Sequence, residues 1–309
     1  MASWKPSCEQ NAAIFSLLLC LGCARLTVIN RKAGSNITFD LAENRVYVPF
    51  PDLVIPAGAK AQLAITYTGA LSTDKQGFFR WEYKKTDGTT AYNAATFFEP
   101  AAARSAYPCW DEPGIKATMS LTLIVNRNQT AVSNMDVASE IEVVSLPLQN
   151  TRPKKVVRFQ TTPLMSTYLT AWAVGNLYYL ESRDYRLPVR IYVALSMNLE
   201  TAKFAIKAAT DALRFFERTF DVSLELPKSD LIGVANYGGG MENWGMIVFD
   251  DGTLSYDQTH INAYDQVKDV TVINHELAHQ WFGDLVTTRW WNDIWLNEGL
   301  YVCHLSPSH

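Results

Sequence analysis

The segment His275-Glu276-Leu277-Ala278-His279 carries residues suited to metal chemistry. On a helix, residues four apart lie on the same face, so His275 and His279 can bind one zinc ion together. Glu276 is then placed to act as a general base toward water rather than as a ligand. Catalytic zinc takes a third protein ligand and keeps an open position. Glu298 is the candidate for that ligand, and 18 residues separate it from His279.

A metal site must be weighed against chance, because this five-residue pattern also occurs in unrelated chains and single helical histidines are often core or surface residues. The acidic element Trp295-Leu296-Asn297-Glu298-Gly299 follows at a distance that allows a turn and the start of an antiparallel helix. It favours a zinc site with one ion per chain. Candidates for orienting the imidazole rings flank these ligands: Asp284, Asn292, Asp293 and Asn297. Helix capping is the alternative role for Asp293 and Asn297.

The elements that must position these residues differ between the two halves of the chain. Apolar residues alternate over 45–50, 62–68 and 119–125, which predicts antiparallel strands. Steps of three and four predict a helix over 201–220, with Asn198 as its N-cap. Strands are expected at 230–235 and 245–249, and helices over 263–282 and from about Trp291.

This change of pattern predicts an α+β fold with two domains. We expect a β-rich, sandwich-like domain over residues 25–180 and an α/β domain over residues 181–309. The apolar run 13–24 resembles a secretory signal, so residues 1–24 are either a signal peptide or an N-terminus outside the domain; a buried strand or helix is the alternative. The run is too short to span a membrane.

Composition excludes several classes of protein. Hydrophobic residues make up 48% and charged residues 19% of the 309, which is typical of a globular protein rather than a disordered or fibrous one. The formal net charge of −4 argues against a nucleic-acid partner. Five cysteines are too few for a disulfide-stapled scaffold, and we expect no zinc site built from thiolates. Sequons at Asn36 and Asn128 suit a secretory protein.

With these residues in hand, the chain resembles the aminopeptidase N family of zinc metallopeptidases from about residue 25 to 300. The resemblance rests on GMENWG at 240–245, HELAHQWFGDLVT at 275–287, WWNDIWLNEG at 290–299, and FEPAAARSAYPCWDEPGIKA at 98–117. It implies a β-saddle domain followed by a thermolysin-like catalytic domain, both incomplete here. It also implies hydrolysis of the N-terminal bond of peptides that carry a free N-terminus.

The resemblance assigns roles to individual residues. It implies that His275, His279 and Glu298 bind Zn²⁺ and that Glu276 is the general base. It implies that Glu242 and Glu99 bind the α-amino group of the substrate. Carboxylates at that place would offset the desolvation of a buried ammonium group. The remaining implied substrate contacts line the neighbouring strand: Gly239, Gly240, Met241 and Asn243.

Three departures from the family pattern accompany the resemblance. The first half of the family's β domain has no counterpart, and Phe97 stands where the family usually has Gln. The chain ends eleven residues after Glu298, before the family's oxyanion-stabilising tyrosine, and Tyr301 is too near the ligand to replace it. We therefore expect a truncated isoform, fragment or incomplete gene model with the family's activity by inheritance and low efficiency.

Other functions stay open at this point. One is a non-catalytic form that binds zinc or peptide without turnover. Another is an epoxide hydrolase of the leukotriene-hydrolase branch, and a thermolysin-type endopeptidase would share only the metal motif. We expect a plasma-membrane ectoenzyme or secreted protein, with membrane association through an anchor missing here; a cytoplasmic protein is the alternative. The oligomeric state cannot be read from the sequence.

Overall fold

The structure is a computed structural model that describes residues 13–20, 37–40, 42–49, 62–143, 153–256 and 262–299. The chain divides into two compact units, residues 1–70 and 71–309. In the first unit, β1 (Ala13–Cys20) pairs antiparallel with β4 (Gln62–Gly69), and β2 (Thr38–Asp40) pairs antiparallel with β3 (Arg45–Tyr47). The apolar run at the N-terminus thus contains a strand, while the rest of residues 1–24 lies outside the described part.

The second unit opens with two antiparallel sheets. The four-stranded sheet has the order β5 (Gly77–Lys84), β6 (Thr90–Phe97), β11 (Trp172–Gly175), β8 (Thr130–Ser133). The three-stranded sheet has the order β7 (Thr122–Asn126), β10 (Lys154–Phe159), β9 (Val137–Val143). Alternating burial along β5, with Phe79, Trp81 and Tyr83 inside, is the period of two that one packed face requires. Short 3₁₀ turns lie at Ala103–Ser105 and Thr167–Leu169.

A mixed five-stranded sheet follows and carries the helices. Its order is β12 (Leu177–Ser182), β13 (Val189–Ala194), β14 (Ser229–Val234), β16 (Met246–Asp250), β15 (Gly240–Met241). The β13–β14 and β14–β16 pairs are parallel and the two edge pairs are antiparallel. Every residue of β14 is buried, as expected of a central parallel strand covered on both faces.

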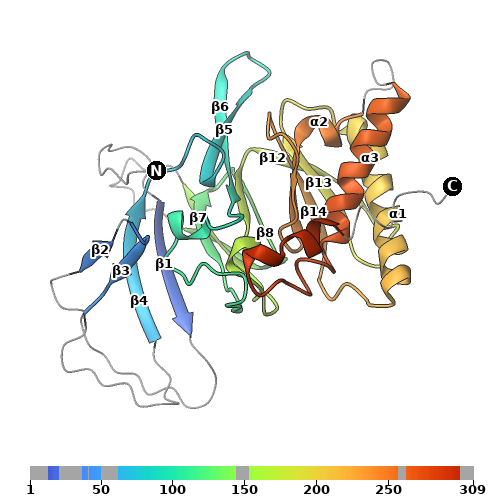
Figure 1. The fold of residues 1–309 in the computed structure, drawn as a ribbon. Coiled ribbons are helices and arrows are strands. Elements are labelled where there is room, and N and C mark those ends of the chain that lie inside the picture. The colour runs from blue at the N-terminus through green and yellow to red at the C-terminus, as the bar shows by residue number, and fades with distance from the viewer. Residues whose placement is uncertain are drawn as a thin grey trace. The chain divides into compact units, whose positions relative to one another are not determined.

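Helices α1 (Lys203–Phe220) and α3 (Ala263–Ala278) lie side by side next to this sheet, with the short α2 (Asp251–Leu254) near their ends (Figure 1). A 3₁₀ turn at Leu199–Ala202 precedes α1, and the Asn198 side chain accepts from the Glu200 N–H there, so Asn198 caps the turn. Phe220 contacts Trp281 and Phe282 beyond the end of α3, with ring centroids 5.8 and 5.1 Å apart. These rings fasten the metal-motif segment to α1.

The predicted α+β class is confirmed, and most predicted elements are present with different ends. The strand predicted at 45–50 stops at Tyr47, and the one at 119–125 begins only at Thr122. The helix predicted over 263–282 ends at Ala278. It stops there because Gly283, at φ +126°, begins a tight reversal in which the Gly283 N–H donates to the Val286 carbonyl.

Candidate metal and peptide site

Helix α3 presents His275 and His279 one turn apart. Asn262 caps its start by accepting from the Asp265 N–H, and Ile273 and Leu277 anchor it in the core. The two imidazole rings are nearly perpendicular, with centroids 4.5 Å apart, and their Nε2 atoms lie 3.0 Å apart. The helix spacing therefore brings two nitrogen ligand atoms to one point.

Glu298 joins the two histidines from the other side of the chain reversal. After a 3₁₀ turn at Trp291–Asp293, residues 295–299 are helical, and Trp291 packs edge-on against Tyr168 with centroids 5.2 Å apart. The Glu298 Oε2 atom lies 3.2 Å from His275 Nε2 and 3.6 Å from His279 Nε2. Ligands about 2.0–2.1 Å from a tetrahedral ion are about 3.3 Å from one another, so these three donor atoms fit a metal such as zinc.

The His279 ring is held by a main-chain group. Its Nδ1 atom lies 2.8 Å from the Phe282 carbonyl oxygen, which can only accept, so Nδ1 donates; in the neutral ring Nε2 then has a lone pair for a metal. The sequence suggests four flanking side chains for this role. One of them, Asp284, instead accepts from the Gln280 side chain at 3.0 Å. A backbone carbonyl is the same for every residue type, so the sequence carried no signal for Phe282.

Glu276 points into the interior beside Gly240. Its side chain is 5% exposed, and a Cβ atom added to Gly240 would lie 2.3 Å from the Glu276 carboxyl carbon. With any other residue at position 240, the carboxylate would have to move from this place. Burial first, and then the neighbouring Glu242 carboxylate, raises the pKa of Glu276 well above its usual range. Such a carboxyl group is suited to taking up and returning a proton.

Glu242 and Glu99 form a second group of carboxylates with Glu298. One oxygen of each lies within 4.8 Å of the others. Glu242 is buried, and among the described residues its Oε1 atom has no hydrogen-bond partner. Burial raises the pKa of Glu242, and burial together with Glu242 and Glu298 raises that of Glu99 to about 8. An unpaired buried oxygen among carboxylates suits a cationic ligand.

The nearby carboxylates change the pKa of His279, and the two histidines change the pKa of Glu298. Burial lowers the pKa of His279, but the hydrogen bond to Glu298 and the Glu242 carboxylate outweigh it and raise the pKa to about 10. The hydrogen bonds from His275 and His279 hold the pKa of Glu298 well below its usual range. The carboxylates thus concentrate negative charge at this site, which a dication and an ammonium group would offset.

The predicted strand contacts lie along β15. The Gly239 carbonyl accepts from the Asp250 N–H at 2.8 Å, and Gly240 pairs with Phe249 of β16. Met241 is 1% exposed and packs into the core, so only its main chain faces the strand edge. Asn243 is buried, and within the described ranges its Oδ1 atom has no partner. Phe97 at the end of β6 packs edge-on against Tyr237, with ring centroids 5.6 Å apart.

Comparison with known families identifies the chain. Residues 23–169 match the Peptidase M1 N-terminal domain, and residues 204–304 match the Peptidase family M1 domain. The chain belongs to peptidase family M1. This confirms the predicted family, and the order of the two matches agrees with the order of the β-rich and α/β parts. The boundary at residues 180–181 stays a prediction.

Curated relatives of this M1 chain are aminopeptidases. It is 43% identical over 242 residues to "Aminopeptidase 2, mitochondrial" of Saccharomyces cerevisiae. This match covers 77% of the chain and 24% of the relative. It is 38% identical over 261 residues to "Aminopeptidase N" of Bos taurus, covering 82% and 26%. It is 36% identical over 264 residues to "Puromycin-sensitive aminopeptidase" of Caenorhabditis elegans, covering 85% and 27%. The chain thus spans about a quarter of the length of these relatives.

Two further expectations meet the structure only in part. Although no thiolate zinc site is expected, Cys20 and Cys23 stand at the Cys-x-x-Cys spacing typical of such sites. Cys23 lies outside the described residues, so that pair stays untested. Within the described ranges, every helix is too short or too polar to cross a membrane. Asn128 of the second sequon lies in an exposed turn between β7 and β8.

Proposed function

We propose that this M1 chain is a zinc-dependent aminopeptidase that hydrolyses the N-terminal bond of peptides. One observation carries the proposal: Glu298 belongs both to the His275–His279 donor set and to the carboxylate group of Glu99 and Glu242. A site for a metal and a site for an ammonium group therefore adjoin.

This adjacency limits which peptide bond can react. In a peptide, the α-amino nitrogen and the carbonyl carbon of the same residue are about 2.5 Å apart, while the next carbonyl is a further ~3.8 Å along the chain. One carboxylate oxygen from each of Glu99, Glu242 and Glu298 lies within 4.8 Å of the other two. An ammonium group held by Glu242 and Glu99 therefore leaves only the first carbonyl within reach of the metal ligands.

His275, His279 and Glu298 would hold the zinc ion. When bound, zinc supplies Lewis acidity toward the scissile carbonyl and the attacking water. The Phe282 carbonyl keeps His279 in the tautomer that binds metal. Glu276 accepts a proton from the attacking water and donates it to the leaving amine, a use that fits its burial and raised pKa.

The amine-binding residues explain the preference for free N-termini. The Glu242 Oε1 atom, which has no partner within the described part of the chain, can accept from the ammonium group, and Glu99 supplies a second negative charge. An acetylated substrate offers no charge and only one N–H, so it leaves buried carboxylates without a partner. Such mismatches cost a site orders of magnitude in discrimination.

Hydrolysis of aminoacyl-naphthylamides by the purified, zinc-loaded chain tests the proposal. We expect turnover that disappears in Glu276→Gln and falls at least ~100-fold when the substrate amine is acetylated. Lys268→Ala, an exposed change on the same helix, is the matched control. Equal cleavage of acetylated substrate would point to an endopeptidase. Zinc binding without any turnover would refute the enzymatic role, and turnover of an epoxide alone would replace it. A membrane-anchored or secreted localisation stays a prediction.

A further inference from the structure

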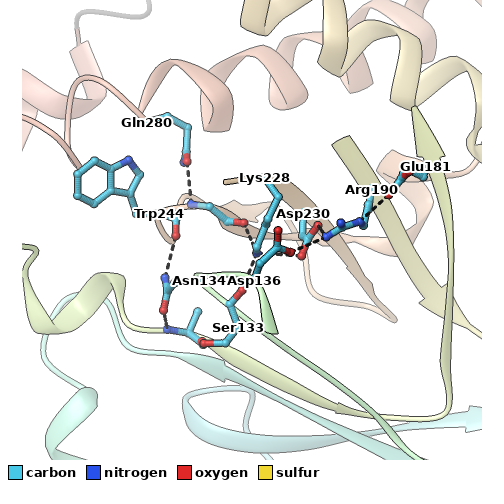
Figure 2. Close-up of polar contacts among 11 residues, drawn as sticks. Ser133, Asn134, Asp136, Glu181, Arg190, Lys228, Asp230, Trp244 and Gln280 are labelled. Atoms are coloured by element: carbon cyan, nitrogen blue, oxygen red, sulfur yellow. Dashed lines mark hydrogen bonds and ion pairs between the residues drawn. The ribbon is translucent and has the colours of Figure 1, made fainter. Parts of the chain in front are cut away.

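The segment Glu242–Gly245 carries the amine-binding carboxylate, and polar side chains hold it from two sides (Figure 2). On one side, just beyond the end of α3, the Gln280 Oε1 atom accepts from the Gly245 N–H, and Gln280 Nε2 donates to the Glu242 carbonyl; both distances are 2.9 Å. One buried amide, 0% exposed, thus binds both ends of the segment.

The opposite side of the segment contacts Asn134 of the β-rich part and Lys228, which directly precedes β14. Asn134 Nδ2 donates to the Trp244 carbonyl at 2.9 Å. Lys228 Nζ donates to the Gly245 carbonyl at 2.6 Å and to the Ser133 carbonyl at 2.5 Å. Gly245 itself has φ +77°, and a Cβ atom there would lie 2.6 Å from the Asn134 carbonyl oxygen. The segment is therefore in close contact with Asn134 and Lys228 on one side and with Gln280 on the other.

Gln280 directly follows the ligand His279, so the path from the metal ligand to the amine-binding residue is two residues and one hydrogen bond long. The third bond of the Gln280 amide, to Asp284 Oδ2 at 3.0 Å, fixes the orientation of the amide. Among side chains of this length, only an amide can both accept from the Gly245 N–H and donate to the Glu242 carbonyl. Glutamate would place a lone pair against the Glu242 carbonyl, and methionine would leave the Gly245 N–H and the Glu242 carbonyl without partners.

We propose that Gln280 is a positioning residue that sets the distance between the metal ligands and the amine-binding Glu242, and with it the selection of the first peptide bond. The inference rests on the proposed function for its consequence in catalysis, but its structural part does not. The hydrogen bonds predict that Gln280→Met frees residues 242–245 while His275, His279 and Glu298 still bind metal.

The experiment compares Gln280→Met with Trp281→Phe in the full chain. The control is the next residue, which donates one partly buried hydrogen bond at 2.8 Å to the Val222 carbonyl, away from the segment. Hydrogen–deuterium exchange of peptides covering 240–246 is the first measurement. We expect at least ~10-fold faster exchange in Gln280→Met and no change there in Trp281→Phe. Unchanged exchange in Gln280→Met would overturn the inference whether or not the chain is active.

The second measurement uses free and acetylated aminoacyl-naphthylamides, with zinc affinity followed by chelator competition. We expect kcat/KM for the free amine to fall ~10- to 100-fold, mainly through KM, the preference over acetylated substrate to shrink, and the zinc dissociation constant to stay within about threefold. Faster exchange with full discrimination would remove the positioning role. An inactive wild-type chain would refute the proposed function and leave the exchange measurement to decide the inference.

Discussion

Adding a single methyl group at Gly240 tests how closely the general base is seated. In Gly240→Ala, the new Cβ atom would lie 2.3 Å from both the carboxyl carbon and the Oε1 atom of Glu276, whereas ordinary contact begins at 3.4 Å. The carboxylate or strand β15 must therefore move by about 1 Å. Because Glu276 is buried, this movement displaces it from the reacting water, and a misplacement of about 1 Å costs about 10²-fold in rate.

The assay measures kcat with an aminoacyl-naphthylamide and the zinc content of the same samples. We expect kcat to fall about 100-fold in Gly240→Ala, zinc to stay at one ion per chain, and stability to drop by about 1–3 kcal/mol from overpacking. Gly69→Ala is the control, because Gly69 has ordinary φ and no heavy atom within 4 Å of an added Cβ. Full activity in Gly240→Ala would refute the placement of Glu276 as the base.

Two further predictions concern charge. In the metal-free chain, Glu99 has a pKa of about 8 against 4.5 for the ordinary group, so the stability it contributes is present below pH 4.5 and is lost as the pH rises through 8. The free energy of unfolding, measured in urea with a chelator present, should fall by up to about 1.4 kcal/mol per pH unit more steeply in wild type than in Glu99→Gln; parallel curves would contradict this. Lys228→Met should cost about 3–5 kcal/mol, because it leaves the buried Asp230 without the ammonium group 2.8 Å away, and adding Asp230→Asn should recover part of that loss. No recovery in the double variant would show that the ion pair is not the cause.

The sequence predicted those parts of the fold that depend on local pattern. The spacing of apolar residues at three and four predicted a helix over 201–220. The observed helix α1 begins at Lys203 and ends, as predicted, at Phe220. The run 45–50 was overpredicted, because Val46 lies exposed in a short hairpin, so the alternation of Val46, Val48 and Phe50 did not mark a buried face there. The end of α3 depends on the reversal at Gly283, which is a feature of tertiary structure rather than of helix propensity.

The candidate site divides in the same way. His275, Glu276 and His279 follow from one helical turn, and the structure brings Glu298 to them. The partners that hold these residues were not predictable, because they are main-chain groups such as the Phe282 carbonyl or a side chain such as Gln280 that acts across the fold. Gln280 directly follows the second histidine of the metal motif. A glutamine in a sequence does not by itself show whether the side chain is buried and bonded to another segment or lies on the surface.

The metal content of the folded chain tests the central claim most directly. After dialysis against excess zinc and removal of loosely bound ions, elemental analysis should find about one zinc per chain in wild type and in Lys268→Ala, and almost none in His275→Ala. Thermal unfolding should show that the His275→Ala sample is still folded. A folded wild-type chain without zinc, or equal zinc content in His275→Ala, would contradict the account.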